Sequence, residues 1–392
     1  GRALARAKAS FVILEARDRI GGRAWTLRYD HAGKQYGLDM GGGWLHSAEH
    51  NYWRKAAEQA GIEIDRSPPP WARRNERPPP PDQPDFGIAL GQFYERIEAA
   101  ENKPDRPASD FLEPNNPANG MINSMCAALN GVTLDKVSAH DFVRYEGAGG
   151  NFRAPRGYGA LITTLAAGLP IELNTRAHLI DHSGARIRVD TNRGAINAKA
   201  IIVATPTPII ASETLRFSPA LPKVVEAAAG LPLGTVDKAF IGFDDDAIPI
   251  GAPPLYGRRP GKPGYDLRPL GMPVIEAFIA GPIAVELELE GAGAAEAFLI
   301  DDLAQQLGGG LRGKLKPLAL SAWAHDPLAG GAYSYAKPGW AEARGALAAP
   351  ASERAFIAGE ALSPAHFGTA HGAADTGVLA AERALSAVKA AS

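Results

Sequence analysis

Hydrophobic and polar positions along the chain switch repeatedly between the periods of strands and helices. Phe11 to Leu14 are four apolar residues that end on Glu15, which predicts a fully buried strand of a parallel sheet with a carboxylate at its carboxyl end. Residues 1–10 are expected to be the second half of a helix. Further helical patterns cover 51–60, 86–101, 118–129, 160–169 and 294–307, and strand patterns cover 24–28, 35–40, 171–174, 186–191, 195–203, 273–280 and 283–289.

The turn after the first strand combines two glycines with an arginine. In a doubly wound fold, ligands bind at the carboxyl ends of the strands, and an acid at such an end accepts hydrogen bonds from an adenosine ribose. Glu15 is therefore the predicted ribose ligand. Gly21 and Gly22 allow backbone amides to approach an anion, and the guanidinium of Arg23 fits a pyrophosphate.

Length and composition narrow the class of protein. The chain has 392 residues, which is too long for one ordinary core, so two domains are expected. Its 41 basic and 43 acidic residues are nearly balanced, which argues against nucleic-acid and anionic-membrane partners and favours a small molecule. Cys126 is the single cysteine and no apolar run approaches the roughly 20 residues of a membrane helix. We expect a cytoplasmic protein, with a signal upstream of Gly1 left open.

The stretch VILEARDRIGGRAWT resembles the second nucleotide-binding element of the flavin-containing amine oxidases. The resemblance implies FAD as cofactor, with Glu15, Ala16, Gly22 and Arg23 among its ligands. In that family a strand and a Gly-x-Gly-x-x-Gly turn precede this element and hold the pyrophosphate. No such turn precedes Phe11 here. We expect that an N-terminal segment is missing from the sequence, because otherwise FAD would be held poorly.

Other segments resemble further elements of the same family. The run Gly41-Gly42-Gly43-Trp44 resembles the turn that passes against the flavin ring, and the histidine of the following Trp-Leu-His, as in polyamine oxidases, would face substrate. Gly359 and Glu360 resemble the turn toward the ribityl chain and diphosphate. Thr369 and Ala370 would open the last helix, whose positive end would face the flavin. The histidine of the Trp-Leu-His run, which would face substrate, is His46.

The resemblance implies a discontinuous α/β plus α+β architecture. A Rossmann-like FAD-binding domain would comprise 1–66, 147–210 and 341–392, interleaved with a substrate domain of mixed sheet and helices at 67–146 and 211–340. The proline runs within 67–84 cannot join a helix or a central strand and predict a linker or surface excursion.

Lys238, Tyr333 and Trp323 are the candidates for chemistry in the rest of the chain. Strand alternation places Val236, Lys238 and Phe240 on one face, so an ammonium points where apolar side chains point and needs a partner. The resemblance implies that Lys238 holds a water against flavin N5; the alternative is a lysine that snorkels from an edge strand. Tyr333 and Trp323 would form walls of the substrate site.

Two absences relative to covalent monoamine oxidases also carry predictions. Ala332 stands where those enzymes have the cysteine that bonds the flavin, so FAD is expected to be noncovalent. Thr369 stands near the position of their second cage tyrosine, which would open one side of the cage. No metal site is predicted.

The predicted reaction removes a hydride from the carbon beside a neutral amine to flavin N5, and water hydrolyses the imine. The electron acceptor is molecular oxygen or another compound, and a homo-oligomer is compatible with the sequence. Two alternatives remain open at this point: an FAD enzyme of the desaturase, protoporphyrinogen-oxidase or L-amino-acid-oxidase kind, and a flavoprotein-like subunit without turnover.

Overall fold

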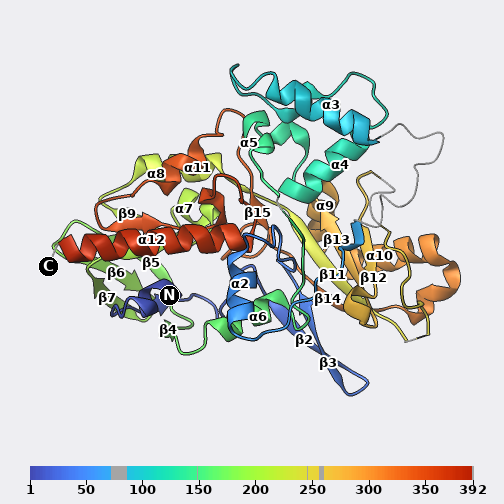
Figure 1. Cartoon of the computed structure of the whole chain (residues 1–392), viewed down its shortest axis with the longest axis horizontal. Coiled ribbons are helices and arrows are strands. Elements are labelled where there is room, and N and C mark those ends of the chain that lie inside the picture. Colours follow the sequence, from blue (N-terminus) through green and yellow to red (C-terminus); the bar gives the residue numbers. More distant parts are fainter. Residues whose placement is uncertain (72–85, 148, 245, 256–259, 391–392) are drawn as a thin grey trace.

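The computed structural model describes residues 1–71, 86–147, 149–244, 246–255 and 260–390. The predicted linker therefore lies outside the described residues from position 72 to position 84. Figure 1 shows three parts: the C-terminal helix with small sheets on one side, an antiparallel sheet with two helices on the other, and a helical lobe above.

Two short parallel strand pairs lie beside the C-terminal helix. β1 (Ile13–Leu14) pairs with β4 (Ile171–Glu172), and β16 (Ala355–Ile357) pairs with β8 (Ile201–Val203). The helix α12 (Ala370–Ala390) packs against β8 and β16 and also contacts α1 (Arg2–Arg6) (Figure 1). This parallel arrangement is the expected type for a nucleotide-binding half.

The strand predicted at Phe11 to Glu15 is shorter and less buried than expected. Only Ile13 and Leu14 form β-structure, both are half-buried, and Val12 is 41% exposed. A parallel strand becomes fully buried when both faces of its sheet are covered, usually by helices. Among the described residues β1 has β4 as its one partner, and residues 11–15 line the large cavity discussed below.

A four-stranded sheet of order β7-β6-β5-β9 adjoins these pairs. Its strands are β5 (Ala177–Asp181), β6 (Ile187–Thr191), β7 (Gly194–Ala198) and β9 (Arg216–Ser218). The single strand predicted at 195–203 is in fact two strands of different sheets, because β7 ends at Ala198 and β8 begins at Ile201. A continuous apolar pattern does not reveal a change of sheet.

The antiparallel sheet of the other half has the order β12-β13-β11-β14. The strands are β11 (Val236–Gly242), β12 (Gly264–Leu267), β13 (Val274–Ala280) and β14 (Lys316–Leu320). One face packs on α9 (Pro282–Glu290) and α10 (Ala292–Leu307) through a core that includes Ile275, Leu299 and Leu303. The opposite face carries Lys238 and borders the cavity.

The strand predicted at 283–289 is wrong, since these residues belong to α9. Their alternating apolar and acidic side chains have period 2, but Gly281 at φ 72° and Pro282 at the first helical position start a helix. Ala284 and Leu287 face the core, while Leu289 is 72% exposed. The local helix start overrides the alternation.

The helical lobe consists of α3 (Phe86–Glu98), α4 (Asn119–Asn130) and α5 (Ala139–Val143). Phe93, Ile97, Ile122 and Phe142 form its core, which also includes Tyr335 from the chain's C-terminal third. The remaining elements are β2 (Thr26–His31), β3 (Lys34–Asp39), α2 (Tyr52–Gln59), α6 (Tyr158–Leu165), α7 (Thr207–Ala211), α8 (Pro222–Gly230), β10 (Leu233–Gly234), β15 (Tyr333–Ser334) and α11 (Ala343–Ala348).

The division into two domains remains a prediction, and core packing bears on one of its boundaries. Leu215, Phe217 and Leu231 share a core with Ile180 and Ile357, which lie in the predicted FAD-binding part. This packing favours a boundary near residue 231 instead of 210.

In the part of the chain that the structure describes, no helix has the length and apolarity needed to cross a bilayer. Within the same residues, no group of three or more His, Cys, Asp or Glu side chains is arranged to hold a metal ion.

Candidate active site

One cavity of about 2340 Å³ brings all of the predicted site residues together. It is lined by segments that are far apart in sequence, from β1 and the glycine turns to β11, β13 and the start of α12. The predicted residues on its wall are Glu15, Ala16, Gly22, Arg23, Gly41, Gly42, Gly43, Trp44, His46, Lys238, Trp323, Tyr333, Gly359, Glu360, Thr369 and Ala370. Their placement is a finding, whereas their individual roles remain predictions.

Glu15 sits at the carboxyl end of β1, as the sequence predicts for a ribose ligand. Its backbone is fixed by bonds to Glu172 and Thr175, and its Oε1 accepts a hydrogen bond from the amide of Arg17 at 2.8 Å. In the next turn Gly22 has φ 57°, and a Cβ there would meet no atom within 4 Å. Glycine is therefore favoured at position 22 by backbone conformation, and the space beside it stays open to the cavity.

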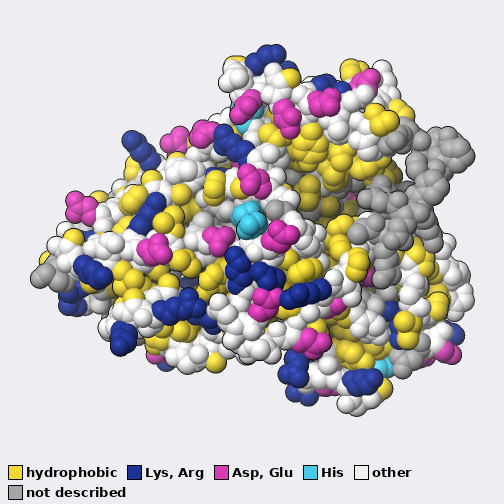
Figure 2. Space-filling view, in the orientation of Figure 1, with side chains coloured by type: hydrophobic (Ala, Val, Ile, Leu, Met, Phe, Trp, Pro, Cys, Tyr) yellow, Lys and Arg dark blue, Asp and Glu magenta, His cyan; other side chains and the backbone are white. Residues whose placement is uncertain are grey.

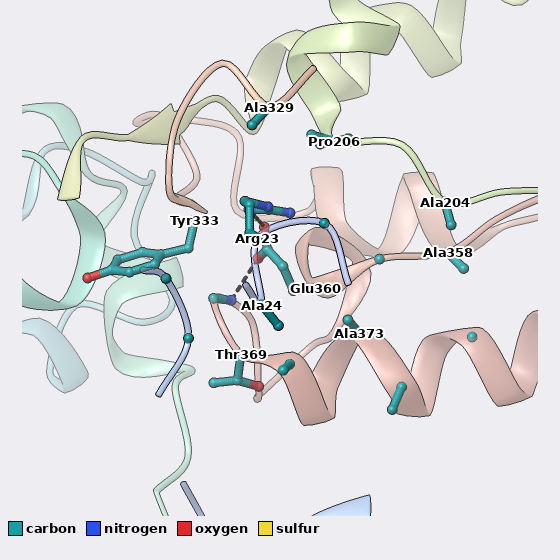
Figure 3. A pocket seen from close by; sticks show the side chains of 18 of the residues that line it. Arg23, Ala24, Ala204, Pro206, Ala329, Tyr333, Ala358, Glu360, Thr369 and Ala373 are labelled. Carbon is teal, nitrogen blue, oxygen red and sulfur yellow. Dashed lines mark hydrogen bonds and ion pairs between the residues drawn. The ribbon is translucent and has the colours of Figure 1, made fainter. Parts of the chain in front are cut away.

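Half-buried Arg23 and buried Glu360 form an ion pair on the wall of the cavity. Arg23 Nη1 donates to Glu360 Oε1 at 2.9 Å and to the carbonyl of Ala332 at 2.6 Å (Figure 3). Glu360 also accepts bonds from Ser334 Oγ at 2.8 Å and from the Gly368 amide at 2.7 Å. Burial raises the pKa of Glu360, but the charge of Arg23 and these donors outweigh burial and hold it below its ordinary value.

A second arginine, Arg344, which the sequence did not single out, is linked to this ion pair through Ser334. Arg344 is 3% exposed and binds Asp141 with two hydrogen bonds of 2.7 Å. Its Nη1 donates to Ser334 Oγ at 2.8 Å, and Ser334 in turn donates to Glu360. A buried chain of polar contacts thus joins α5 of the helical lobe to the ion pair at the cavity.

In the glycine turn at 41–43, a backbone contact leaves no room for a side chain at Gly41. A Cβ on Gly41 would lie 1.9 Å from the carbonyl oxygen of Arg23. Trp323 Nε1 donates to the carbonyl of Met40 at 2.9 Å, and Trp323 is 4% exposed. Trp323 is predicted to be a wall of the substrate site, but the structure shows it mainly supporting this turn.

Tyr333 and Thr369 lie at the junction of the glycine turn and α12. The Tyr333 hydroxyl donates to the carbonyl of Ala128 in the helical lobe, and burial raises its pKa. Thr369 Oγ1 donates to His366 O at 2.6 Å and accepts from the Gly372 amide at 3.0 Å, so it caps the N-terminus of α12. Figure 3 shows Tyr333 directed away from Arg23 and Glu360, toward the lobe.

His46 lies in an aromatic corner of the cavity. Its Nδ1 is 2.7 Å from Asn151 Oδ1, and its ring centroid is 6.3 Å from that of Trp71. Burial lowers the pKa of His46, although Asn151 opposes the shift, so the ring is neutral at physiological pH. Asn51, which caps α2, donates from its amide to the His46 carbonyl at 2.8 Å and fixes the backbone there.

Lys238 is the cation at the centre of the cavity's sheet face. It is 6% exposed, and Nζ lies 2.8 Å from Glu276 Oε1. A Cβ on Gly43 would lie 2.9 Å from Nζ, so the ammonium abuts the glycine turn. The alternative of a snorkelling edge-strand lysine is wrong, because β11 is flanked by β13 and β14 and every residue in it is buried.

Asp237, on the opposite face of β11, holds the loop that carries Trp323. Its Oδ1 accepts from Ser321 Oγ at 2.7 Å and from the Trp323 amide at 3.1 Å. Burial, together with the neighbouring Glu288 carboxylate, raises the pKa of Asp237 to about 8. Asp237 is therefore protonated at neutral pH and can donate to Glu288, which also accepts from the backbone amides of Ala324 and His325.

The raised pKa of Asp237 predicts a pH-dependent stability. An acid whose folded-state pKa is raised stabilises the fold fully below its unfolded pKa near 4, and this contribution falls as the pH rises to about 8. We expect Asp237→Asn to remove part of that decline, which can reach about 1.4 kcal/mol per pH unit. Urea unfolding at several pH values measures how the free energy of unfolding changes with pH in each protein. Asp244→Asn, at an exposed ion pair with Lys316, should keep the decline, and an unchanged decline in Asp237→Asn would contradict the prediction.

The residues on the cavity wall fit FAD in their chemistry. An acid ends β1, an arginine and an open glycine lie beyond it, and a close-packed glycine turn abuts a lysine. Between them, small side chains line the space: Ala24, Ala204, Pro206, Ala329, Ala358 and Ala373 (Figure 3). With FAD bound, Glu15 would contact the ribose, Arg23 would contact the diphosphate, and the turn at 41–43 would contact the flavin ring.

Comparisons with known proteins agree with this assignment. The sequence profile of the family described as flavin containing amine oxidoreductase matches residues 1–78 and 72–385. Polyamine oxidase 4 of Oryza sativa subsp. japonica is 27% identical over 97% of this chain and 85% of its own length. Polyamine oxidase 2 of Arabidopsis thaliana is 26% identical over 97% and 84%.

A solved structure shows the same fold. Cyclohexylamine oxidase from Brevibacterium oxydans IH-35A matches with a TM-score of 0.78 over 99% of this chain and 96% of that chain. The two sequences are 18% identical, so this likeness concerns the fold alone. Together with the family match, it confirms the predicted fold class, a Rossmann-like FAD-binding part combined with a sheet-and-helix part.

Proposed function

The chain belongs to the flavin-containing amine oxidoreductases, with FAD as cofactor, and from that premise we propose that it oxidises small apolar amines with noncovalently bound FAD. The observation that carries the proposal is the position of Lys238, which abuts the Gly43 turn inside an aromatic cavity. Family membership makes the chain an enzyme and removes the alternative of a subunit without turnover.

The amine class follows from the lining of the cavity beside the helical lobe. Aromatic side chains from five segments line it there: Tyr94, Phe142, Tyr145, Phe278, Tyr333 and Phe367. Figure 2 shows hydrophobic side chains gathered on the face beneath α3 and α4. Such a surface stabilises a bound alkyl or aryl group by about 1.5–3 kcal/mol for each side-chain-sized group buried.

The charges of the side chains in this part of the cavity also favour an apolar amine as substrate. Among the described residues, three carboxylates line the cavity: Glu15, Glu276 and Glu360. Both oxygens of Glu276 already face cations, Lys238 and Arg153, and Glu360 is paired with Arg23. An extended polycation would need further anions along its length. We therefore expect an uncharged substituent on the substrate amine, even though the two plant relatives described above are polyamine oxidases by name.

The protein's contribution to the reaction is binding and proton control. FAD supplies the hydride acceptor at N5. The apolar wall favours the neutral amine over the ammonium, because burial disfavours the charged form. Lys238 can hold a water beside the glycine turn, and Ala332 offers no nucleophile for a bond to the flavin.

An anaerobic titration tests this proposal. The purified holoenzyme is mixed with benzylamine, cyclohexylamine, hexylamine, spermidine and an L-amino acid, and bleaching of the flavin absorption is followed at several pH values. We expect the apolar monoamines to bleach it with a second-order rate constant at least about tenfold above that of spermidine. The rate constant should rise with pH as the free amine loses its proton.

Two results would count against the proposal in different ways. Faster bleaching by spermidine would show that the apolar substrate class is wrong while leaving amine oxidation intact. A yellow protein that none of these amines bleaches would overturn amine oxidation itself and favour a different FAD reaction.

A further inference from the structure

Glu276 and Lys238 are diagonal neighbours on the cavity face of the antiparallel sheet. In the register of β11 and β13, Lys238 pairs with Phe278 and Phe240 pairs with Glu276. The side chains of Lys238 and Glu276 therefore share a face and lie two register positions apart. Lys238 Nζ lies 2.8 Å from Glu276 Oε1, and the two side chains are 7% and 5% exposed. Both residues line the cavity.

The second oxygen of Glu276 is held by an arginine from a different segment. Arg153 Nη2 lies 2.5 Å from Glu276 Oε2, and Nη1 lies 3.5 Å from Asp266 Oδ2. The Arg153 guanidinium also lies over the Trp44 ring, 4.4 Å from its centroid. Burial raises the pKa of Glu276, but Arg153 and Lys238 outweigh it and lower the pKa to about 2, so the carboxylate is ionised at working pH.

These contacts form a closed arrangement around the glycine turn. Gly43 abuts Lys238 Nζ, the next residue Trp44 lies under Arg153, and Glu276 joins the two cations. Apart from its ion pair with Glu276, Nζ has no hydrogen-bond partner among the described residues, so its remaining N–H groups can donate to a bound molecule. The other charged or titratable groups that act on this region are Asp39 of β3 and His46.

We propose that Glu276 is a positioning residue of the oxidation site, which holds the Lys238 ammonium against the turn at Gly43 while Arg153 holds Glu276. This inference rests on the proposed function. Without the carboxylate, the two cations would face each other in a buried site with no anion between them, and Lys238 would move away or release its proton. Glu276 therefore acts through Lys238 and does not touch substrate itself.

A double-mutant cycle tests the proposal, with variants Glu276→Gln, Lys238→Met and the two combined. Anaerobic bleaching of the flavin by the best monoamine is measured across pH for each holoenzyme. We expect Glu276→Gln alone to slow bleaching about tenfold and to add an ionisation to its pH profile. The double variant should bleach less than twofold more slowly than Lys238→Met alone. Asp266→Asn, which removes a carboxylate near Arg153 but not near Lys238, should leave the shape of the pH profile unaltered.

Thermal unfolding of the same four proteins gives a readout independent of turnover. Glu276→Gln should lower the unfolding midpoint more in the unaltered background than in Lys238→Met, because the latter no longer contains the stranded ammonium. Equal slowing and equal midpoint shifts in both backgrounds would overturn the proposal and leave Glu276 a purely structural residue. If no amine bleaches the unaltered enzyme, the proposed function fails, and the midpoints still decide whether Glu276 holds Lys238.

Discussion

Replacing Lys238 with methionine is expected to leave the protein folded and yellow but to slow bleaching of its flavin by amine at least about 100-fold. Methionine has a similar length and suits a position that is 6% exposed. Glu276 keeps Arg153 as its partner in this variant, so no buried carboxylate is stranded. What disappears is the Lys238 ammonium beside Gly43, and positioned proton-handling groups contribute roughly 10²–10⁴-fold to rates. Anaerobic stopped-flow absorbance measures the effect.

A matched control for this variant lies on the neighbouring strand. Lys316→Met makes the same chemical change on β14, where the lysine side chain is 66% exposed and pairs with the surface residue Asp244. We expect its bleaching rate to stay within about twofold of the unaltered enzyme. If both variants bleach equally slowly, or if Lys238→Met bleaches at the normal rate, Lys238 has no special role at this site.

The cavity residues that the sequence predicts share one property: each belongs to a short motif whose neighbours restrict its surroundings. Glu15 follows an apolar run, Arg23 follows two glycines, and Gly43 follows two more. Lys238 interrupts an apolar alternation, which is itself a local signal. Local signals were enough to place these residues on one cavity because the family resemblance supplied the topology.

The partners of these residues could not be predicted in the same way. Arg153 and Glu276 are 123 positions apart, and Asp141 and Arg344 are 203 apart. Arg344 lies in an alanine-rich segment where an arginine is typical of an exposed helix face, yet it is 3% exposed. Only the tertiary fold decides whether such a charge meets water or a buried carboxylate. Asp237 left a weaker signal, since it is a second charged residue, next to Lys238, in an otherwise apolar strand.

The buried charges behind the cavity are connected in a chain that reaches the predicted diphosphate side. Asp141, which is fully buried, is neutralised by Arg344, and Arg344 orients Ser334. Ser334 then donates to Glu360, the partner of Arg23. Arg344 also lies over the ring of Phe367, 3.7 Å from its centroid, so its environment is aromatic as well as charged. Removing Arg344 would therefore affect both the fold and the cofactor site.

Arg344→Met is accordingly expected to lower the free energy of unfolding by about 3–5 kcal/mol, because it strands the buried carboxylate of Asp141. It should also weaken FAD binding about tenfold, since Ser334 loses the charge-assisted donor that orients its hydroxyl toward Glu360. Urea unfolding measures the first effect, and titration of apoprotein with FAD measures the second. Arg144→Met is the matched control: Arg144 pairs with Glu342 at the surface, with side chains 40% and 85% exposed, and its loss should cost less than about 1 kcal/mol. Similar losses for both arginines would mean that burial of the Asp141 pair contributes nothing special, and normal FAD affinity in Arg344→Met would show that the chain of contacts ends before Glu360.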